Sequence, residues 1–126
     1  MNAKSILVVD DSRSLRQMVS YILNVSGYQV IEAIDGMDGW EKAIAQKVDL
    51  VFTDQNMPQY DGMWLIKALR NSENHRKTPI LMLTTESSDE MKAMGKQAGA
   101  TGWIVKPFDP DRMIALVKKL IGDPSV

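Results

Sequence analysis

Short apolar runs alternate with amphipathic segments five times along this chain, and this alternation restricts the fold more than any other feature of the sequence. Four runs are almost continuously apolar, which is typical of parallel strands whose two faces are both covered by helices. These runs are residues 6–9, 50–53, 80–83 and 103–105. A fifth run, residues 29–33, alternates apolar and polar side chains and suits the edge of a sheet. The pattern predicts a single three-layer α/β domain of (βα)5 type with a parallel five-stranded sheet.

Apolar residues at helical spacing predict a helix after each strand. Ser12 or Ser14 is expected to cap the first helix, and Gly27 to end it. The polar stretch 71–79 is predicted to be a loop, with His75, the one histidine of the chain, exposed to solvent. The residues that mark the helices are Leu15, Met18, Val19, Ile22 and Leu23; Met37, Trp40 and Ile44; Ile66 and Leu69; Met91 and Met94; and Met113, Leu116, Val117, Leu120 and Ile121.

The composition is that of one folded, soluble domain. The 126 residues are 44% hydrophobic and 25% charged, and the net charge of −1 gives no general attraction to nucleic acid. The absence of cysteine excludes disulfides, thiolate metal sites and cysteine nucleophiles. No run approaches ~18 apolar residues, so we expect a cytoplasmic protein without a membrane span. We expect the domain to cover residues 1–122, with 123–126 as a short C-terminal tail.

Polar, reactive side chains follow the ends of four of the apolar runs. Asp10 and Asp11 follow the first run, Asp54 follows the run at 50–53, Thr84 the run at 80–83, and Lys106 the last run. Because the carboxyl ends of the strands in an open parallel sheet line one crevice, we expect these side chains to meet there.

This set of side chains predicts a site for a divalent cation and a phosphoryl group. Three clustered carboxylates repel one another, and a hard cation that prefers oxygen ligands and keeps some of its water relieves that repulsion, which favours Mg²⁺ over Zn²⁺. A carboxylate beside the metal can form an aspartyl phosphate. The hydroxyl of Thr84 and the ammonium of Lys106 are suitable donors to phosphoryl oxygens.

Several motifs resemble those of the receiver domains of two-component response regulators, and especially the stand-alone chemotaxis regulators of CheY type. The resemblance covers residues 4–121 and implies a flavodoxin-like fold with the strand order 2-1-3-4-5, which is taken from the family. The motifs are Val8-Val9-Asp10-Asp11-Ser12, Thr53-Asp54-Gln55-Asn56-Met57-Pro58, Asp61-Gly62, Thr84-Thr85 and Lys106-Pro107-Phe108.

The resemblance assigns a role to each residue of the predicted site. It implies that Asp54 is the phosphoacceptor and that Mg²⁺ is bound by Asp10, Asp11, Asp54 and the backbone carbonyl of Asn56. Lys106 would contact the phosphoryl group, and its bond to Pro107 would be cis.

The resemblance also implies a conformational switch and a short-lived phosphoryl group. Thr84 would be the switch hydroxyl, with an aromatic residue at position 103 as its partner. Asn56 and Glu86 match the positions that tune dephosphorylation in chemotaxis regulators.

Two residues depart from the family pattern. The family often has Tyr or Phe where this chain has Trp103, which leaves the fit and the resting orientation of the ring open. The best-known chemotaxis regulator has tryptophan where this chain has Gln55. Neither departure is expected to affect the chemistry of phosphorylation.

Together these features predict a phosphorylation-activated signalling switch that catalyses only its own phosphotransfer and autodephosphorylation. A sensor histidine kinase would phosphorylate it, and a phosphatase is a further expected partner. The fourth helix, fifth strand and fifth helix would bind an acidic output partner, a flagellar motor switch protein in chemotaxis. We expect a monomer that binds neither nucleic acid nor membrane. The basic residues considered for the output surface are Lys92, Lys96, Lys106, Arg112, Lys118 and Lys119.

Three alternatives stay open from the sequence. A phosphatase with an aspartyl-phosphate intermediate needs a second aspartate two residues after the nucleophile, where this chain has Asn56, which cannot act as the general acid. A mononucleotide carrier needs hydroxyl and glycine donors after the first strand, where Asp10 and Asp11 would repel phosphate. The third alternative is a receiver domain of another phosphorelay or of a truncated transcription factor.

Overall fold

Five parallel strands form one sheet in the order β2-β1-β3-β4-β5 in the computed structural model, which describes residues 3–85 and 88–124. The fold class and the strand order predicted above are confirmed, and β2 lies at the edge of the sheet as expected. The strands are β1 (Ser5–Val9), β2 (Gln29–Ala33), β3 (Leu50–Asp54), β4 (Ile80–Thr84) and β5 (Gly102–Val105).

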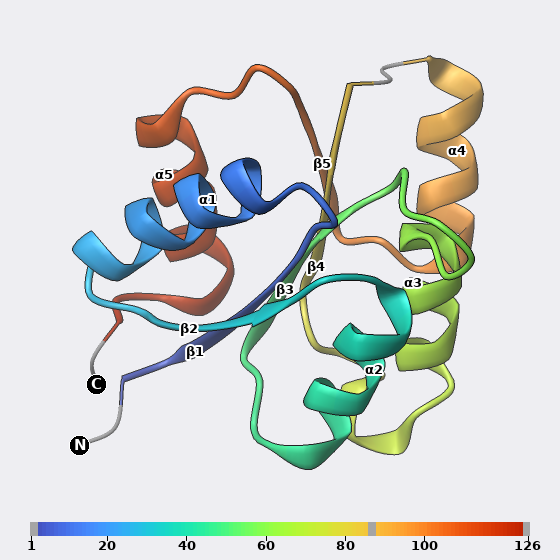
Figure 1. Ribbon diagram of the computed structural model, residues 1–126, viewed down its shortest axis with the longest axis horizontal. Helices are drawn as coiled ribbons and strands as arrows, with labels where there is room; N and C mark the ends of the chain where they lie inside the picture. Colours follow the sequence, from blue (N-terminus) through green and yellow to red (C-terminus); the bar gives the residue numbers. More distant parts are fainter. Residues whose placement is uncertain (1–2, 86–87, 125–126) are drawn as a thin grey trace.

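Helices cover both faces of the sheet (Figure 1). One face is covered by α1 and α5, and the other by α2, α3 and α4. Ile6 and Val8 of β1 pack into the first of these layers, whereas Leu7 and Val9 pack into the second, as alternation along a strand requires. The helices are α1 (Arg13–Val25), α2 (Gly36–Ala45), α3 (Gly62–Arg70), α4 (Asp89–Ala98) and α5 (Pro110–Ile121).

Each α-helix begins at the edge of the sheet where the strands end, and a side chain caps it there. In each case an oxygen of the cap residue accepts a hydrogen bond from a backbone N–H of the first turn, which satisfies a donor that has no partner within the helix. The first cap is Ser12 rather than Ser14, and α1 ends just before Gly27, whose φ of 103° suits glycine. The caps are Ser12, Asp35, Asp61, Ser88 and Asp109.

The prediction that His75 is an exposed loop residue was wrong. The stretch 71–79 contains a turn of 3-10 helix, η1 (Glu73–His75), and His75 is only 4% exposed. Its Nε2 lies 2.9 Å from the carbonyl oxygen of Ala43, and its Nδ1 lies 3.0 Å from Oγ1 of Thr78. Since a carbonyl can only accept, Nε2 donates to it. The ring therefore satisfies a carbonyl in the last turn of α2 that has no partner within the helix.

Three of the residues that mark helices in the sequence are largely exposed. Met18 and Ile44 are each 52% exposed and Met94 is 49% exposed, although their helices form as predicted. Among the described residues, no helix has the length and apolar character needed to cross a membrane.

We predict that His75→Ala lowers the free energy of unfolding by about 2 to 4 kcal/mol, because it removes one buried and one partly buried hydrogen bond and leaves a cavity. Urea unfolding of the two proteins measures this difference. Asn74→Ala, at the exposed neighbouring position, is the matched control and should change stability little. Equal unfolding midpoints for His75→Ala and the wild type would contradict the structural role of the ring.

Candidate functional site

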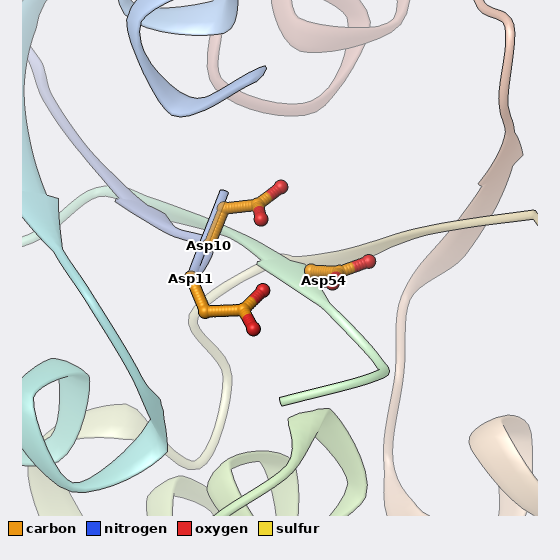
Figure 2. A group of neighbouring side chains, drawn as sticks. All are labelled: Asp10, Asp11 and Asp54. Atoms are coloured by element: carbon orange, nitrogen blue, oxygen red, sulfur yellow. The ribbon is translucent and has the colours of Figure 1, made fainter. Parts of the chain in front are cut away.

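Three carboxylates meet where β1 and β3 end (Figure 2). Asp10 and Asp11 follow β1, and Asp54 is the last residue of β3. One oxygen from each of the three lies within 4.8 Å of the others. Asp10 and Asp54 are buried, at 3% and 6% exposure, whereas Asp11 is exposed. The sequence prediction that these side chains come together is confirmed.

The loop after β1 holds Asp10 in a defined orientation. Its Oδ1 accepts a hydrogen bond from the backbone N–H of Ser12 at 2.8 Å. Its backbone carbonyl accepts from Nη1 of Arg16 at 2.8 Å, and Arg16 in turn pairs with Glu32 of β2 at 3.0 Å. Sequence reasoning missed Arg16, because nothing in its position signals a contact with a backbone carbonyl six residues earlier.

The charge of Asp10 is poorly compensated in this position. Burial raises its pKa from 3.8 to about 6, and the neighbouring charges of Asp54 and Asp11 act in the same direction. The N–H of Ser12 and the ammonium of Lys106 oppose this rise but do not cancel it. The pKa of Asp10 is therefore raised mainly because the carboxyl group is buried away from water, and secondarily because of the neighbouring carboxylates.

Lys106 is the cation of the site. Its Nζ lies 2.9 Å from Oδ1 of Asp54 and 3.9 Å from Oδ2 of Asp10. The bond between Lys106 and Pro107 is cis, as the resemblance implied. The backbone N–H of Lys106 donates to the carbonyl of Thr84 at 2.8 Å, which ties the end of β4 to the loop that carries the lysine.

Of the two residues expected to act as a switch, Thr84 is the last residue of β4 and Trp103 lies in β5. Thr84 is fully buried at the end of β4, one residue beyond Leu83, the partner of Asp54 in the strand register. Trp103 is partly buried against the core, and its ring lies so close to α4 that a Cβ at Gly95 would approach it to 2.6 Å. The resting orientation that the sequence left open is thus an indole packed against α4.

Of the two residues expected to tune dephosphorylation, Asn56 is among the residues that the structure describes and Glu86 is not. Asn56 is exposed in the loop that follows β3, two residues after Asp54. Glu86 lies outside the described residues. The roles of both stay predictions.

The ligand chemistry of the site fits Mg²⁺. The cluster offers only carboxylate oxygens, and the exposed Asp11 leaves one side open to water. Hard oxygen donors with space for water are what Mg²⁺ prefers. The raised pKa of Asp10 supplies the electrostatic reason for a cation to bind, since a divalent charge would stabilise the ionised carboxylates.

Comparisons with known proteins agree with this arrangement. The family model of the response regulator receiver domain matches residues 6–118. Chemotaxis protein CheY1 of Helicobacter pylori is 35% identical over 119 residues, which cover 93% of this chain and 96% of that protein. The solved structure of chemotaxis protein CheY4 of Vibrio cholerae has a TM-score of 0.90 and 45% identity, over 94% of this chain and 98% of that chain.

Transcriptional regulators are also similar to this chain. The alkaline phosphatase synthesis transcriptional regulatory protein PhoP of Bacillus subtilis is 40% identical over 118 residues, which cover 94% of this chain and 48% of PhoP. The chain therefore spans about half the length of the transcriptional regulators that it matches, and nearly all of CheY1.

The raised pKa of Asp10 predicts how the stability of the metal-free protein depends on pH. Between pH 3.8 and about 6 the folded protein keeps a proton that the unfolded chain releases. The stability contributed by this group is therefore fully present below pH 3.8 and is lost as the pH rises through about 6. At about 1.4 kcal/mol per pKa unit, the loss is about 3 kcal/mol.

Asp10→Asn should remove this dependence and make the metal-free protein more stable than the wild type at about pH 7.5. Urea unfolding in the presence of a chelator, at about pH 5 and about pH 7.5, measures both effects. A variant whose stability changed with pH as steeply as that of the wild type would show that Asp10 is not the responsible group.

Proposed function

The chain belongs to the response regulator receiver family, and we propose that it is a signalling switch in which Asp54 accepts a phosphoryl group from a sensor histidine kinase. The observation that carries this proposal is the cluster of three carboxylates within 4.8 Å, with the ammonium of Lys106 at 2.9 Å from Asp54. This is the geometry that a phosphoacceptor, its metal and a phosphoryl-binding lysine require.

In the proposed transfer, a carboxylate oxygen of Asp54 attacks the phosphorus of a phosphohistidine. The oxygen–phosphorus bond forms as the bond from phosphorus to the imidazole nitrogen breaks, and the nitrogen takes the electron pair. Asp10, Asp11, Asp54 and the carbonyl of Asn56 would hold Mg²⁺, which when bound neutralises charge on the phosphoryl oxygens. Lys106 would exchange its contact with Asp54 for one with a phosphoryl oxygen.

The switch would act through the end of β4. Thr84 would donate its hydroxyl to the phosphoryl group, and its carbonyl already accepts from the N–H of Lys106. Movement of Thr84 would change the space beside Trp103 and so alter the surface formed by α4, β5 and α5. Exposed basic residues on α4 and α5 support an acidic binding partner for that surface: Lys92, Lys96, Arg112, Lys118 and Lys119.

For the biological setting we propose chemotaxis, with a flagellar motor switch protein as the output partner. Similarity to CheY1 and CheY4 over nearly their whole length supports this assignment. We further propose a receiver domain over residues 1–122, a tail over 123–126, and autodephosphorylation tuned by Asn56 and Glu86. The second candidate is the receiver part of a transcriptional regulator, which the similarity to PhoP supports.

Phosphorylation at Asp54 is directly testable. With Mg²⁺ and a small phosphodonor, the wild type should gain one phosphoryl group as an acyl phosphate that hydroxylamine removes, and Asp54→Asn should gain none. Intact-protein mass spectrometry measures the addition. Asp123→Asn, an exposed aspartate near the C-terminus, makes the same change in charge and should be modified like the wild type. Undiminished incorporation into Asp54→Asn would identify another nucleophile.

Binding of Mg²⁺ should stabilise the folded protein, because the unfolded chain does not hold the three carboxylates together. Asp11→Asn removes a ligand and should weaken binding about tenfold or more. Calorimetric titration with Mg²⁺ and thermal unfolding with and without the metal measure the two effects, again with Asp123→Asn as the control. If Asp11→Asn bound Mg²⁺ as tightly as the wild type, the metal site would have to lie elsewhere.

A further inference from the structure

Gln55 lies between the proposed phosphoacceptor and Asn56, and its side chain is buried, with 7% exposure. Its Oε1 accepts a hydrogen bond from the backbone N–H of Met63 at 2.9 Å, and its Nε2 donates to Oδ2 of Asp61 at 3.2 Å. Its backbone carbonyl accepts from the N–H of Gly62 at 3.1 Å. Three hydrogen bonds from one residue thus join the end of β3 to the start of α3.

The first turn of α3 rests directly on the backbone of Asp54. A Cβ at Gly62 would come within 2.6 Å of the carbonyl oxygen of Asp54, so only glycine permits this approach. The same carbonyl accepts a hydrogen bond from the hydroxyl of Thr53 at 2.9 Å. The start of α3 is therefore packed directly against the backbone of Asp54.

The loop between Gln55 and Asp61 is also held at its far end. The carbonyl of Tyr60 accepts a hydrogen bond from the N–H of Gly36, the first residue of α2, at 3.0 Å. The N–H of Tyr60 donates to the carbonyl of Pro58 at 2.7 Å. Asn56 therefore lies in a short closed loop whose one end is fixed by the side chain of Gln55 and whose other end is fixed by α2.

We propose that Gln55 is a positioning residue of the metal site, which acts by fixing the loop that presents the backbone carbonyl of Asn56 and by fixing the direction of Asp54. The inference rests on the proposed function, in which these two residues bind Mg²⁺. Mg²⁺ demands near-ideal octahedral geometry, so ligands on a loosened loop bind it less well. Groups that orient metal ligands commonly affect affinity although they do not touch the metal.

The first test removes both side-chain hydrogen bonds with little change in volume. Gln55→Met should weaken Mg²⁺ binding about tenfold, measured by calorimetric titration. Gln46→Met is the matched control, since Gln46 is exposed at the end of α2. This variant should bind Mg²⁺ with the affinity of the wild type. His75→Ala is a second control, because it lowers stability at a distance from the site and should leave the affinity unchanged.

The second test exchanges the amide of Gln55 and the carboxylate of Asp61 between the two positions. In the double variant Gln55→Glu, Asp61→Asn, the glutamate accepts from the N–H of Met63 and from the amide of Asn at position 61. The oxygen of that amide can still accept from the N–H of Trp64, which Asp61 Oδ1 does at 2.9 Å. All the hydrogen bonds are thereby restored with an unchanged net charge, so the affinity for Mg²⁺ should return to within about twofold of the wild type.

These outcomes separate the inference from the function on which it rests. Loss of affinity in Gln55→Met together with recovery in the double variant supports the inference. Unchanged affinity in folded Gln55→Met overturns it alone, since the wild type would still bind the metal. If Gln55→Met does not fold, a double variant that folds but binds Mg²⁺ tenfold more weakly overturns it. Failure of the wild type to bind Mg²⁺ overturns both.

Discussion

The contact between the ammonium of Lys106 and the carboxylates of Asp54 and Asp10 is the interaction on which the rest of this site depends. One positive charge lies 2.9 Å from Asp54 and 3.9 Å from Asp10, while three carboxylate oxygens lie within 4.8 Å of one another. The balance is incomplete, as the raised pKa of Asp10 indicates. A site of this kind costs stability in the metal-free protein and attracts cations. Under the proposed function, Lys106 would exchange its contact with Asp54 for one with a phosphoryl group.

The fold maintains this unfavourable cluster through backbone contacts around it. Each carboxylate lies at the end of a buried strand, and the helix that follows is capped at the same edge of the sheet. Arg16 holds the carbonyl of Asp10, and Thr53 holds that of Asp54. Because the strands are fixed in register by the sheet, the repulsion cannot be relieved by moving the backbone. It can be relieved by protonation or by a bound cation.

Hydrogen bonds and the backbone of β5 together connect the carboxylates to α4. Lys106 contacts Asp54 through its side chain and Thr84 through its backbone. Trp103, three residues before the lysine, packs against α4 at Gly95. A larger residue at position 95 would collide with the indole, so the glycine is what permits its present position. Under the proposed function, we expect each of these residues to respond when the partner of Lys106 changes.

The class of fold and the composition of the site can be predicted from the sequence, because both depend on local patterns. Strand and helix periods, caps and the residues at strand ends can be read over a few positions, and Asp10, Asp11, Asp54 and Lys106 were found in this way. The strand order could be predicted only from the resemblance to a family, because apolar runs do not determine which strands pair with each other.

The contacts between residues far apart in the chain depend on the tertiary structure. His75 is buried and donates to a carbonyl of α2, 32 residues earlier, whereas its polar neighbours in the sequence indicated a solvent-exposed position. In the sequence, Gln55 is a neutral departure from the family pattern, whereas in the structure both ends of its amide bond to the start of α3. The side-chain type of a polar residue tells which hydrogen bonds it can make, but only the packed chain determines which partners come within reach.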